Sequence, residues 1–277
     1  MISTFPTMGT VASLRAEADA PLAAIQAVFR SADERFSLYR PESEASRIAD
    51  GRLRLADASA EMRDAYAEAL EWRTATDGAF TPHRPDGVLD LAGTVKARAI
   101  AAAGRLLERG DGSPWLLTVG GDVLGSRAAA VDAASAAHAD PVRIGIVDPD
   151  DRRSLLCAVP LTGDRRAVAT SGTAERGEHV WRRPHDPDGV RFRQVTVLAA
   201  DILTADVLAT AVLAGGEPTL DRVLARWDVD VLACGTGGDL LVSDRLRAAI
   251  SAHPTTRVSA EAAPADGVRV REVVSSW

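Results

Sequence analysis

The chain has 277 residues, enough for one large domain or for two lobes that share a core, and its hydrophobic (46%) and charged (26%) fractions are ordinary for a globular protein. A net charge of −7 argues against a general nucleic-acid binder, which needs clustered basic groups. The sequence shows no signal-peptide pattern and no apolar run of membrane-spanning length, and its two cysteines, Cys157 and Cys234, lie in apolar runs. We therefore expect a cytoplasmic protein with buried free thiols and no membrane insertion.

Hydrophobic periodicity and turn residues predict the elements along the chain. In order, they are a strand at 10–17, helices at 21–35, 58–75 and 94–108, strands at 115–119, 142–147, 154–160, 166–170 and 195–199, helices at 204–214 and 217–227, a hairpin of 229–233 with 239–242, and a helix at 243–252. Helices at both ends and strands between them favour an α+β fold with mixed, largely antiparallel sheets. Residues 126–141 are low in complexity, and the tail 253–277 is expected to be partly ordered.

The helix expected at 204–214 carries the first candidate site. Thr204 is a plausible N-cap, and Asp206 and Thr210 are four residues apart, on one helical face. A carboxylate and a hydroxyl together offer the oxygen ligands that Mg²⁺ prefers, and a helix start favours nearby phosphate. Spacing alone also allows Asp206 to complement the helix dipole and Thr210 to be a neutral filler.

Lys96 is the single lysine of the chain, against 31 arginines, and the chain contains no asparagine. Arginine replaces lysine well on a solvated surface but poorly where a compact ammonium is needed. Lys96 follows Asp90 and Gly93 at the start of a helix, where it could lie over a bound anion. The alternative is a capping Asp90 and an exposed Lys96.

Two loops at strand ends could bring backbone N–H groups to a cofactor. Gly120-Gly121-Asp122 follows the strand 115–119, although many hairpins contain such a turn. Thr170-Ser171-Gly172 ends the strand 166–170, and His179 comes seven residues after Gly172. The other histidines lie in polar segments and are expected to be solvated.

The order of these segments resembles that of the ApbE family, the FAD:protein FMN transferases. The matching segments are Met8-Gly9-Thr10, Ser37-Leu38-Tyr39, Ser43-Glu44-Ala45-Ser46-Arg47, Gly78-Ala79-Phe80-Thr81, Asp90 to Lys96, Thr118 to Asp122, Thr170-Ser171-Gly172 with His179, and Thr204-Ala205-Asp206 with Thr210. The resemblance runs from about residue 5 to about 215, and it implies a single ApbE-like domain over 1–252. The chain departs from the family pattern at Thr81, Ala97 and Thr118, in the residues after His179, and in a short connection between Phe80 and Asp90.

The resemblance implies a role for each matched residue. Asp206 and Thr210 would bind Mg²⁺ through their side chains and Gly93 through its carbonyl, while His179, Lys96 and Asp206 would be catalytic. The cofactor-binding set would be Met8, Tyr39, Ala79, Phe80, Thr81, Asp90, Lys96, Gly120, Gly121, Asp122, Ser171, Gly172 and Val180.

The implied activity is magnesium-dependent transfer of FMN from FAD to a threonine of an acceptor flavoprotein, with release of AMP. Two alternatives stay open. In the first, an FAD pyrophosphatase uses the same metal site with water in place of the acceptor. In the second, a non-catalytic protein binds FAD, which the departure at Thr81 and the altered segment after His179 favour.

Overall fold

The computed structural model describes residues 1–16, 20–130, 142–172, 191–252 and 270–273. Within these residues one sheet has the strand order β1-β2-β3-β4-β7-β8-β9-β10-β11, and β5 and β6 form a separate hairpin. The strands are β1 (Ile2–Thr7), β2 (Thr10–Ala16), β3 (Trp115–Val119), β4 (Asp122–Gly125), β5 (Arg143–Val147), β6 (Leu155–Pro160), β7 (Ala167–Gly172), β8 (Phe192–Ala199), β9 (Asp230–Gly235), β10 (Leu240–Ser243) and β11 (Val270–Val273). Neighbours in the large sheet are antiparallel except β10 and β11, which confirms the expected α+β fold with largely antiparallel sheets.

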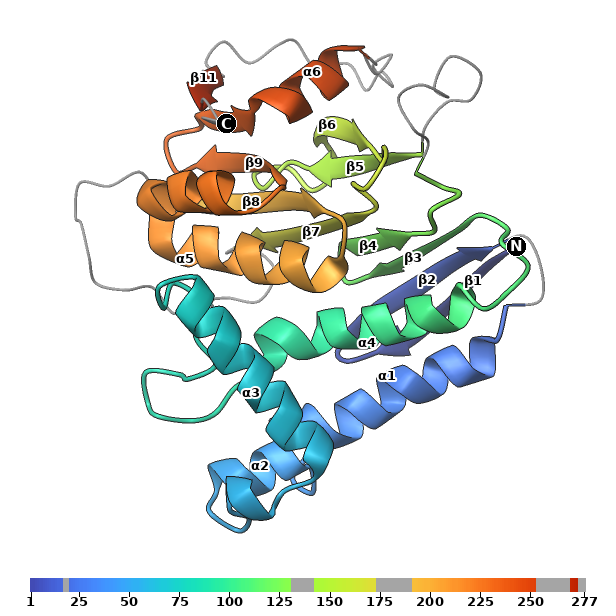
Figure 1. Cartoon of the computed structure of the whole chain (residues 1–277), viewed down its shortest axis with the longest axis vertical. Coiled ribbons are helices and arrows are strands. Elements are labelled where there is room, and N and C mark those ends of the chain that lie inside the picture. The colour runs from blue at the N-terminus through green and yellow to red at the C-terminus, as the bar shows by residue number, and fades with distance from the viewer. Residues whose placement is uncertain (17–19, 131–141, 173–190, 253–269, 274–277) are drawn as a thin grey trace.

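Helices cover one face of the large sheet (Figure 1). The helices are α1 (Leu22–Phe36), α2 (Glu44–Ala49), α3 (Ala60–Ala75), α4 (Ala92–Leu107), α5 (Ile202–Arg226) and α6 (Asp244–Ala252), with the short 3-10 helix η1 (Leu55–Asp57) before α3. α4 and α5 lie along the sheet, whereas α2 and α3 extend away from it, in the lower part of Figure 1. The layer formed by α4 and α5 therefore lies between the sheet and the more distant helices α2 and α3.

Three groups of buried apolar residues hold these layers together. The largest lies between the sheet and the helices and includes Leu117 of β3, Val197 of β8 and Leu208 of α5. Strand alternation sends Val168 to the opposite face, where it joins a second group with residues of β5, β6 and α6. The third group joins α3, α4 and α5 and includes Phe80. The sheet is thus covered on both faces, and the helices have a core of their own.

Most of the expected elements are present, with ends shifted by a few residues, and four were missed. β1 carries Pro6 and is an edge strand, a position where a missing N–H is tolerated. α2 and β4 are only 6 and 4 residues long, too short to show a period. β11 lies in the tail that was expected to be partly ordered, and it pairs with β10.

The start of α5 differs from the expectation that Thr204 is its N-cap. The cap is Asp201, whose Oδ1 accepts a hydrogen bond from Thr204 N at 2.8 Å. Thr204 lies inside the first turn and donates its hydroxyl to Asp201 Oδ2 at 2.7 Å. A carboxylate is an equally good cap, so the helix begins two residues before 204. The two helices expected at 204–214 and 217–227 form α5, which breaks at Gly216 with φ 67° and ψ −160°.

Both cysteines are free, as expected; Cys234 is buried and Cys157 is half-buried. Burial raises the pKa of the Cys157 thiol to about 11, so it stays protonated near neutral pH. No helix within the described ranges is long and apolar enough to cross a membrane.

Candidate active site

The helices α4 and α5 meet at a buried group of charges formed by Lys96, Asp122 and Asp206. Lys96 lies in the first half of α4, and its Nζ is 2.5 Å from Asp122 Oδ2 and 3.9 Å from Asp206 Oδ2. The three side chains are 11%, 0% and 6% exposed, respectively. Burial of charges is costly unless they are paired, so the lysine joins two carboxylates that the fold brings together from distant segments. We call these three residues the lysine cluster.

Asp122 fixes the lysine cluster to the sheet. It is the first residue of β4, and its Oδ1 accepts a hydrogen bond from Thr170 N of β7 at 3.2 Å. β4 and β7 are neighbouring antiparallel strands, so this bond continues their pairing beyond Val123 and Val168. The side chain expected to contact a cofactor is therefore enclosed and held by Lys96 and by the backbone of β7.

Thr210 lies one turn after Asp206 on α5, and its hydroxyl is held from the sheet. Thr210 Oγ1 and Ser171 Oγ of β7 are 3.0 Å apart in a hydrogen bond. Both residues are half-buried. The spacing of four residues places Asp206 and Thr210 on one face of α5. The fold thus joins Thr210, one of the two expected metal ligands, to Ser171 at the end of β7.

Glycines allow close packing around this group. Gly120 and Gly121 form the turn between β3 and β4, with φ of 55° and 90°, a conformation that favours glycine. A Cβ on Gly93 would lie 2.8 Å from Phe80 Cε2, so the first turn of α4 rests directly on the Phe80 ring. Phe80 and Ala79 are buried in the third apolar group, together with residues of α3, α4 and α5.

Three other expected site residues, Met8, Thr81 and Asp90, lie in turns and connections between the helices and strands. Asp90 Oδ1 accepts a hydrogen bond from Ala92 N at 2.9 Å, but the N-cap of α4 is Leu91, which makes no side-chain cap bond. The alternative of a capping Asp90 with an exposed Lys96 is wrong, because Lys96 is buried. Thr81 accepts one from His83 N at 3.2 Å. Met8 forms part of the turn between β1 and β2, with φ 45°, and packs against both helix-side apolar groups.

Of the remaining expected site residues, Tyr39 is the one that the structure describes apart from the lysine cluster. Tyr39 is 87% exposed in the connection between α1 and α2, near the end of the molecule away from the sheet (Figure 1). His179 and Val180 lie outside the described residues. The structure therefore groups residues from four of the expected segments and leaves Tyr39 apart from that group.

The segment Ser43 to Arg47 has a structural role. Ser43 is the N-cap of α2, accepting from Ser46 N at 2.9 Å, and its own hydroxyl donates to Ser37 O at 2.6 Å. Glu44 accepts from Arg35 Nε at 3.2 Å and from Ser59 N at 2.8 Å. These bonds tie the end of α1 to α2 and to the start of α3, which accounts for the residue types at these positions.

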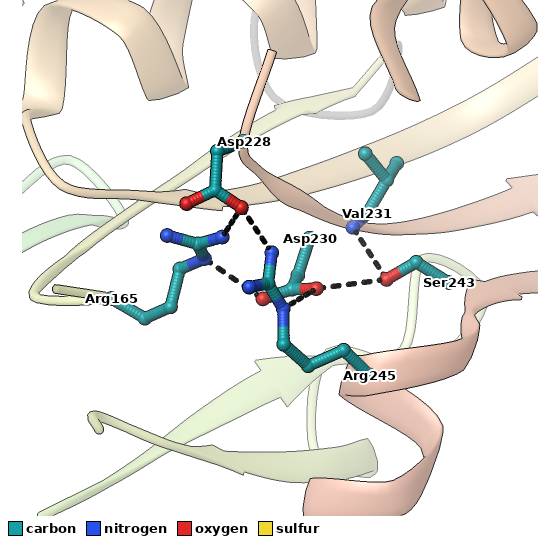
Figure 2. Close-up of polar contacts among 6 residues, drawn as sticks. All are labelled: Arg165, Asp228, Asp230, Val231, Ser243 and Arg245. Carbon is teal, nitrogen blue, oxygen red and sulfur yellow. Dashed lines mark hydrogen bonds and ion pairs between the residues drawn. The ribbon is translucent and has the colours of Figure 1, made fainter. Parts of the chain in front are cut away.

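A second charged cluster is formed by Arg165, Asp228, Asp230, Ser243 and Arg245 (Figure 2). Arg165 donates to Asp230 Oδ2 at 2.9 Å and to Asp228 Oδ1 at 2.5 Å, and Arg245 donates to Asp230 Oδ1 at 3.0 Å and to Asp228 Oδ1 at 2.7 Å. Ser243 Oγ donates to Asp230 Oδ1 at 3.3 Å. These groups border a cavity of about 450 Å³. Two guanidinium groups face two carboxylates, so we call this set the arginine clasp and interpret it as a structural link between β7, β9, β10 and α6.

The oxygen donors near the lysine cluster suit a hard cation. Asp206 supplies a carboxylate and Thr210 a hydroxyl, both types that Mg²⁺ accepts. No group of three or more His, Cys, Asp or Glu side chains that could hold a metal occurs in the described part of the chain. Mg²⁺ is commonly held by one or two carboxylates together with substrate phosphates, so such a site needs no larger cluster.

The sequence matches the model of the ApbE family over residues 8–88 and 81–233. The chain belongs to the ApbE family. The two matched segments overlap at 81–88, in the connection between α3 and α4. Among the curated proteins, none matches this sequence.

Solved structures of ApbE proteins share the fold. The ApbE protein of Thermotoga maritima aligns with a TM-score of 0.70 at 19% identity, covering 90% of this chain and 99% of that one. The flavin transferase ApbE of Vibrio cholerae aligns at 0.67 and 20% identity, covering 90% and 98%. The apo flavinyl transferase ApbE of Pseudomonas stutzeri aligns at 0.67 and 20% identity, covering 91% and 97%. The ApbE fold is therefore present over nearly the whole of each protein.

The connection between α3 and α4, where the family match divides, is a compact turn. Arg84 N donates to Val88 O at 2.9 Å, and Asp90 N donates to Pro82 O at 2.8 Å. Tyr66 of α3 holds the turn through a 3.2 Å hydrogen bond between its hydroxyl and His83 Nε2, so His83 is half-buried and not solvated as expected. This ApbE member thus reaches the start of α4 by a short path that still places Gly93 on Phe80.

Proposed function

We propose that this protein is an FAD:protein FMN transferase, which moves FMN from FAD to a threonine of an acceptor flavoprotein. The acceptor hydroxyl oxygen forms a bond to the FMN-side phosphorus while the bond from that phosphorus to the bridging oxygen breaks. AMP leaves with the bridging oxygen, and the hydroxyl proton passes to a base. His179 is the residue that the family resemblance assigns as this base, and imidazole titrates near neutral pH.

The observation that carries the proposal is the position of Lys96 between α4 and α5. Its ammonium is 3.9 Å from Asp206 Oδ2, and Thr210 follows one turn later. This arrangement unites a fixed cation with two oxygen donors beside the start of α4. A diphosphate needs positive charge around it, and phosphoryl transfer depends mainly on positioning and electrostatics.

The residues that would hold a magnesium ion are Asp206 and Thr210, with the carbonyl of Gly93 as a third donor. When bound, the ion would supply charge neutralisation for the diphosphate of the substrate. Ser171 would keep the Thr210 hydroxyl in place through the 3.0 Å hydrogen bond between them. Lys96 would counter the negative charge that develops on the departing AMP.

The test is incubation of the full chain with FAD, Mg²⁺ and a set of threonine-containing acceptor peptides. Flavin attached to a peptide, with an equal amount of AMP, is the expected result. Asp206→Asn should lower the rate by about 100-fold or more, because a metal ligand contributes several kcal/mol to charge stabilisation. Asp221→Asn is the matched control, since Asp221 lies on the same helix but is exposed, and it should transfer at the wild-type rate.

Three other outcomes would overturn the transferase proposal in different ways. Free FMN and AMP without labelled peptide would indicate an FAD pyrophosphatase. A tightly bound yellow protein that leaves FAD intact in the presence of Mg²⁺ would indicate a flavin-binding protein without catalysis. No flavin binding at all would exclude each of these functions.

A further inference from the structure

Asp122 is placed so that it controls where the ammonium of Lys96 lies. Its side chain is fully buried, with an exposed fraction of 0%. Thr170 N donates to Oδ1 at 3.2 Å, and this N–H belongs to the backbone of β7, which pairs with β8 on its other side. The carboxylate therefore has a fixed direction, set by the sheet and independent of α4 and α5.

The single ammonium of Lys96 faces two carboxylates at unequal distances. It forms ion pairs with both, at 2.5 Å from Asp122 Oδ2 and at 3.9 Å from Asp206 Oδ2. Both carboxylates are buried, so each would attract the ammonium strongly in surroundings that screen charge poorly. The observed geometry shows that Asp122 has the closer contact.

A lysine that paired directly with Asp206 would compete with a metal ion for the same carboxylate. We infer that Asp122 is a positioning residue, which holds the Lys96 ammonium away from Asp206 and so leaves Asp206 able to bind a divalent cation. This inference rests on the proposed function, because it assumes a cation at Asp206.

A purely structural salt bridge between Asp122 and Lys96 predicts a different pattern of mutant effects. If the pair only stabilises the fold, removing either partner, or both, has no specific effect on metal binding. If Asp122 were itself a metal ligand, its loss would weaken binding whatever stands at position 96. The positioning role alone predicts that removing Lys96 as well restores the binding that is lost when Asp122 is neutralised.

The experiment measures Mn²⁺ binding to the full chain by the electron paramagnetic resonance signal of free Mn²⁺, with and without FAD. Asp122→Asn should weaken binding by about tenfold or more, the size typical for groups that orient metal ligands. The double variant Asp122→Asn with Lys96→Met should bind within about twofold of the wild type, the scatter expected between independent sites. Asp230→Asn, which neutralises a buried carboxylate of the arginine clasp, is the control and should bind Mn²⁺ as the wild type does.

Several results would overturn the inference. They are wild-type binding by Asp122→Asn, weak binding by the double variant, or no Mn²⁺ uptake by the wild type. If Asp122→Asn does not fold, the double variant decides alone, because it replaces the charged pair by two neutral side chains of similar size.

A wild type that shows the expected binding pattern but transfers no FMN would refute the proposed function and leave the role of Asp122 intact. If the wild type transfers FMN but Asp122→Asn binds Mn²⁺ as the wild type does, the proposed function stands and the role given to Asp122 is refuted.

Discussion

Two charge clusters in the described part of the chain differ in geometry and in the type of cation they contain. The arginine clasp has two guanidinium groups for two carboxylates, and both oxygens of Asp230 accept hydrogen bonds (Figure 2). In the lysine cluster a single ammonium contacts two carboxylates unequally, at 2.5 Å from Asp122 Oδ2 and at 3.9 Å from Asp206 Oδ2. The two guanidinium groups bond to two carboxylates and so link elements, whereas the unequal contacts of the single ammonium fit the positioning role inferred for Asp122.

The choice of arginine or lysine follows from this difference. The planar guanidinium of Arg165 reaches Asp228 and Asp230 at once, which suits a permanent link. Lysine offers a compact charge on a flexible stem, which suits a site where the ammonium must lie near a ligand. In a chain with 31 arginines, the one lysine stands where the guanidinium geometry would be a poor substitute.

The largest expected effect comes from breaking the arginine clasp. Arg165→Met leaves Asp230, only 5% exposed, without one of its two guanidinium partners. We expect the free energy of unfolding to fall by about 3–5 kcal/mol, measured by urea denaturation. FMN transfer per folded molecule should not change; a loss of transfer in the folded protein would show that the clasp belongs to the active site. Arg222→Met, at a half-exposed pair with Asp77, should cost about 1 kcal/mol or less.

Crowding the start of α4 should affect the lysine cluster from its other side. Gly93→Ala places a methyl group 2.8 Å from the Phe80 ring, which we expect to cost about 1–3 kcal/mol of stability and to displace Lys96. Thermal unfolding and FMN transfer should both decline. Adding Phe80→Leu should restore part of both, since it makes room for the methyl group. Full transfer activity in Gly93→Ala alone would mean that this contact does not set the position of α4.

Removing the hydroxyl that holds Thr210 should have a smaller effect, confined to the cation site. Ser171→Ala loses the 3.0 Å hydrogen bond to Thr210, and we expect about tenfold weaker Mg²⁺ activation of transfer. Thr170→Val is the matched control, because neighbouring side chains on a strand point to opposite faces and Thr170 bonds instead to Thr196 at 2.9 Å. Equal Mg²⁺ dependence in both variants would contradict the role given to Ser171.

The smallest effect concerns acid stability of the arginine clasp. Hydrogen bonds from Arg165 and Arg245 lower the pKa of Asp228 to about 2, from 3.8. The ionised carboxylate therefore stabilises the folded state above about pH 4, and this contribution is lost as the pH falls from about 4 to about 2. Because the side chain is 70% exposed, the contribution should be about 1 kcal/mol or less. Urea midpoints between pH 2 and pH 5 should depend less on pH in Asp228→Asn than in the wild type.

Sequence patterns predicted the lysine cluster in part. The spacing of Asp206 and Thr210 and the unique Lys96 identified one side of the site, because local periodicity determines which residues share a helical face. The partner of Lys96 was not predicted, since Asp122 is 26 positions away in the chain and only the pairing of β4 with β7 turns it toward α4. The segment Gly120-Gly121-Asp122 predicted a backbone contact to a cofactor. In the structure it is the Asp122 side chain that takes part in the lysine cluster, through its ion pair with Lys96.

The arginine clasp could not be predicted at all. Arg165 lies between β6 and β7, Asp228 between α5 and β9, and Arg245 in the first turn of α6. They share no motif, and their charges alone resemble those of a solvated surface. The fold was predicted better, since long amphipathic helices and alternating strands show their period in sequence, while the edge strand β1 and the short elements α2 and β4 do not.

The most direct test of the difference between the clusters is a single titration with Mn²⁺. Wild type, Asp206→Asn and Asp230→Asn would be compared by the resonance signal of free Mn²⁺ in the presence of FAD. We predict that the wild type and Asp230→Asn bind the ion equally, whereas Asp206→Asn loses at least about tenfold in affinity. Equal binding by Asp206→Asn and the wild type would show that the lysine cluster holds no cation, and the proposed active site would then be wrong.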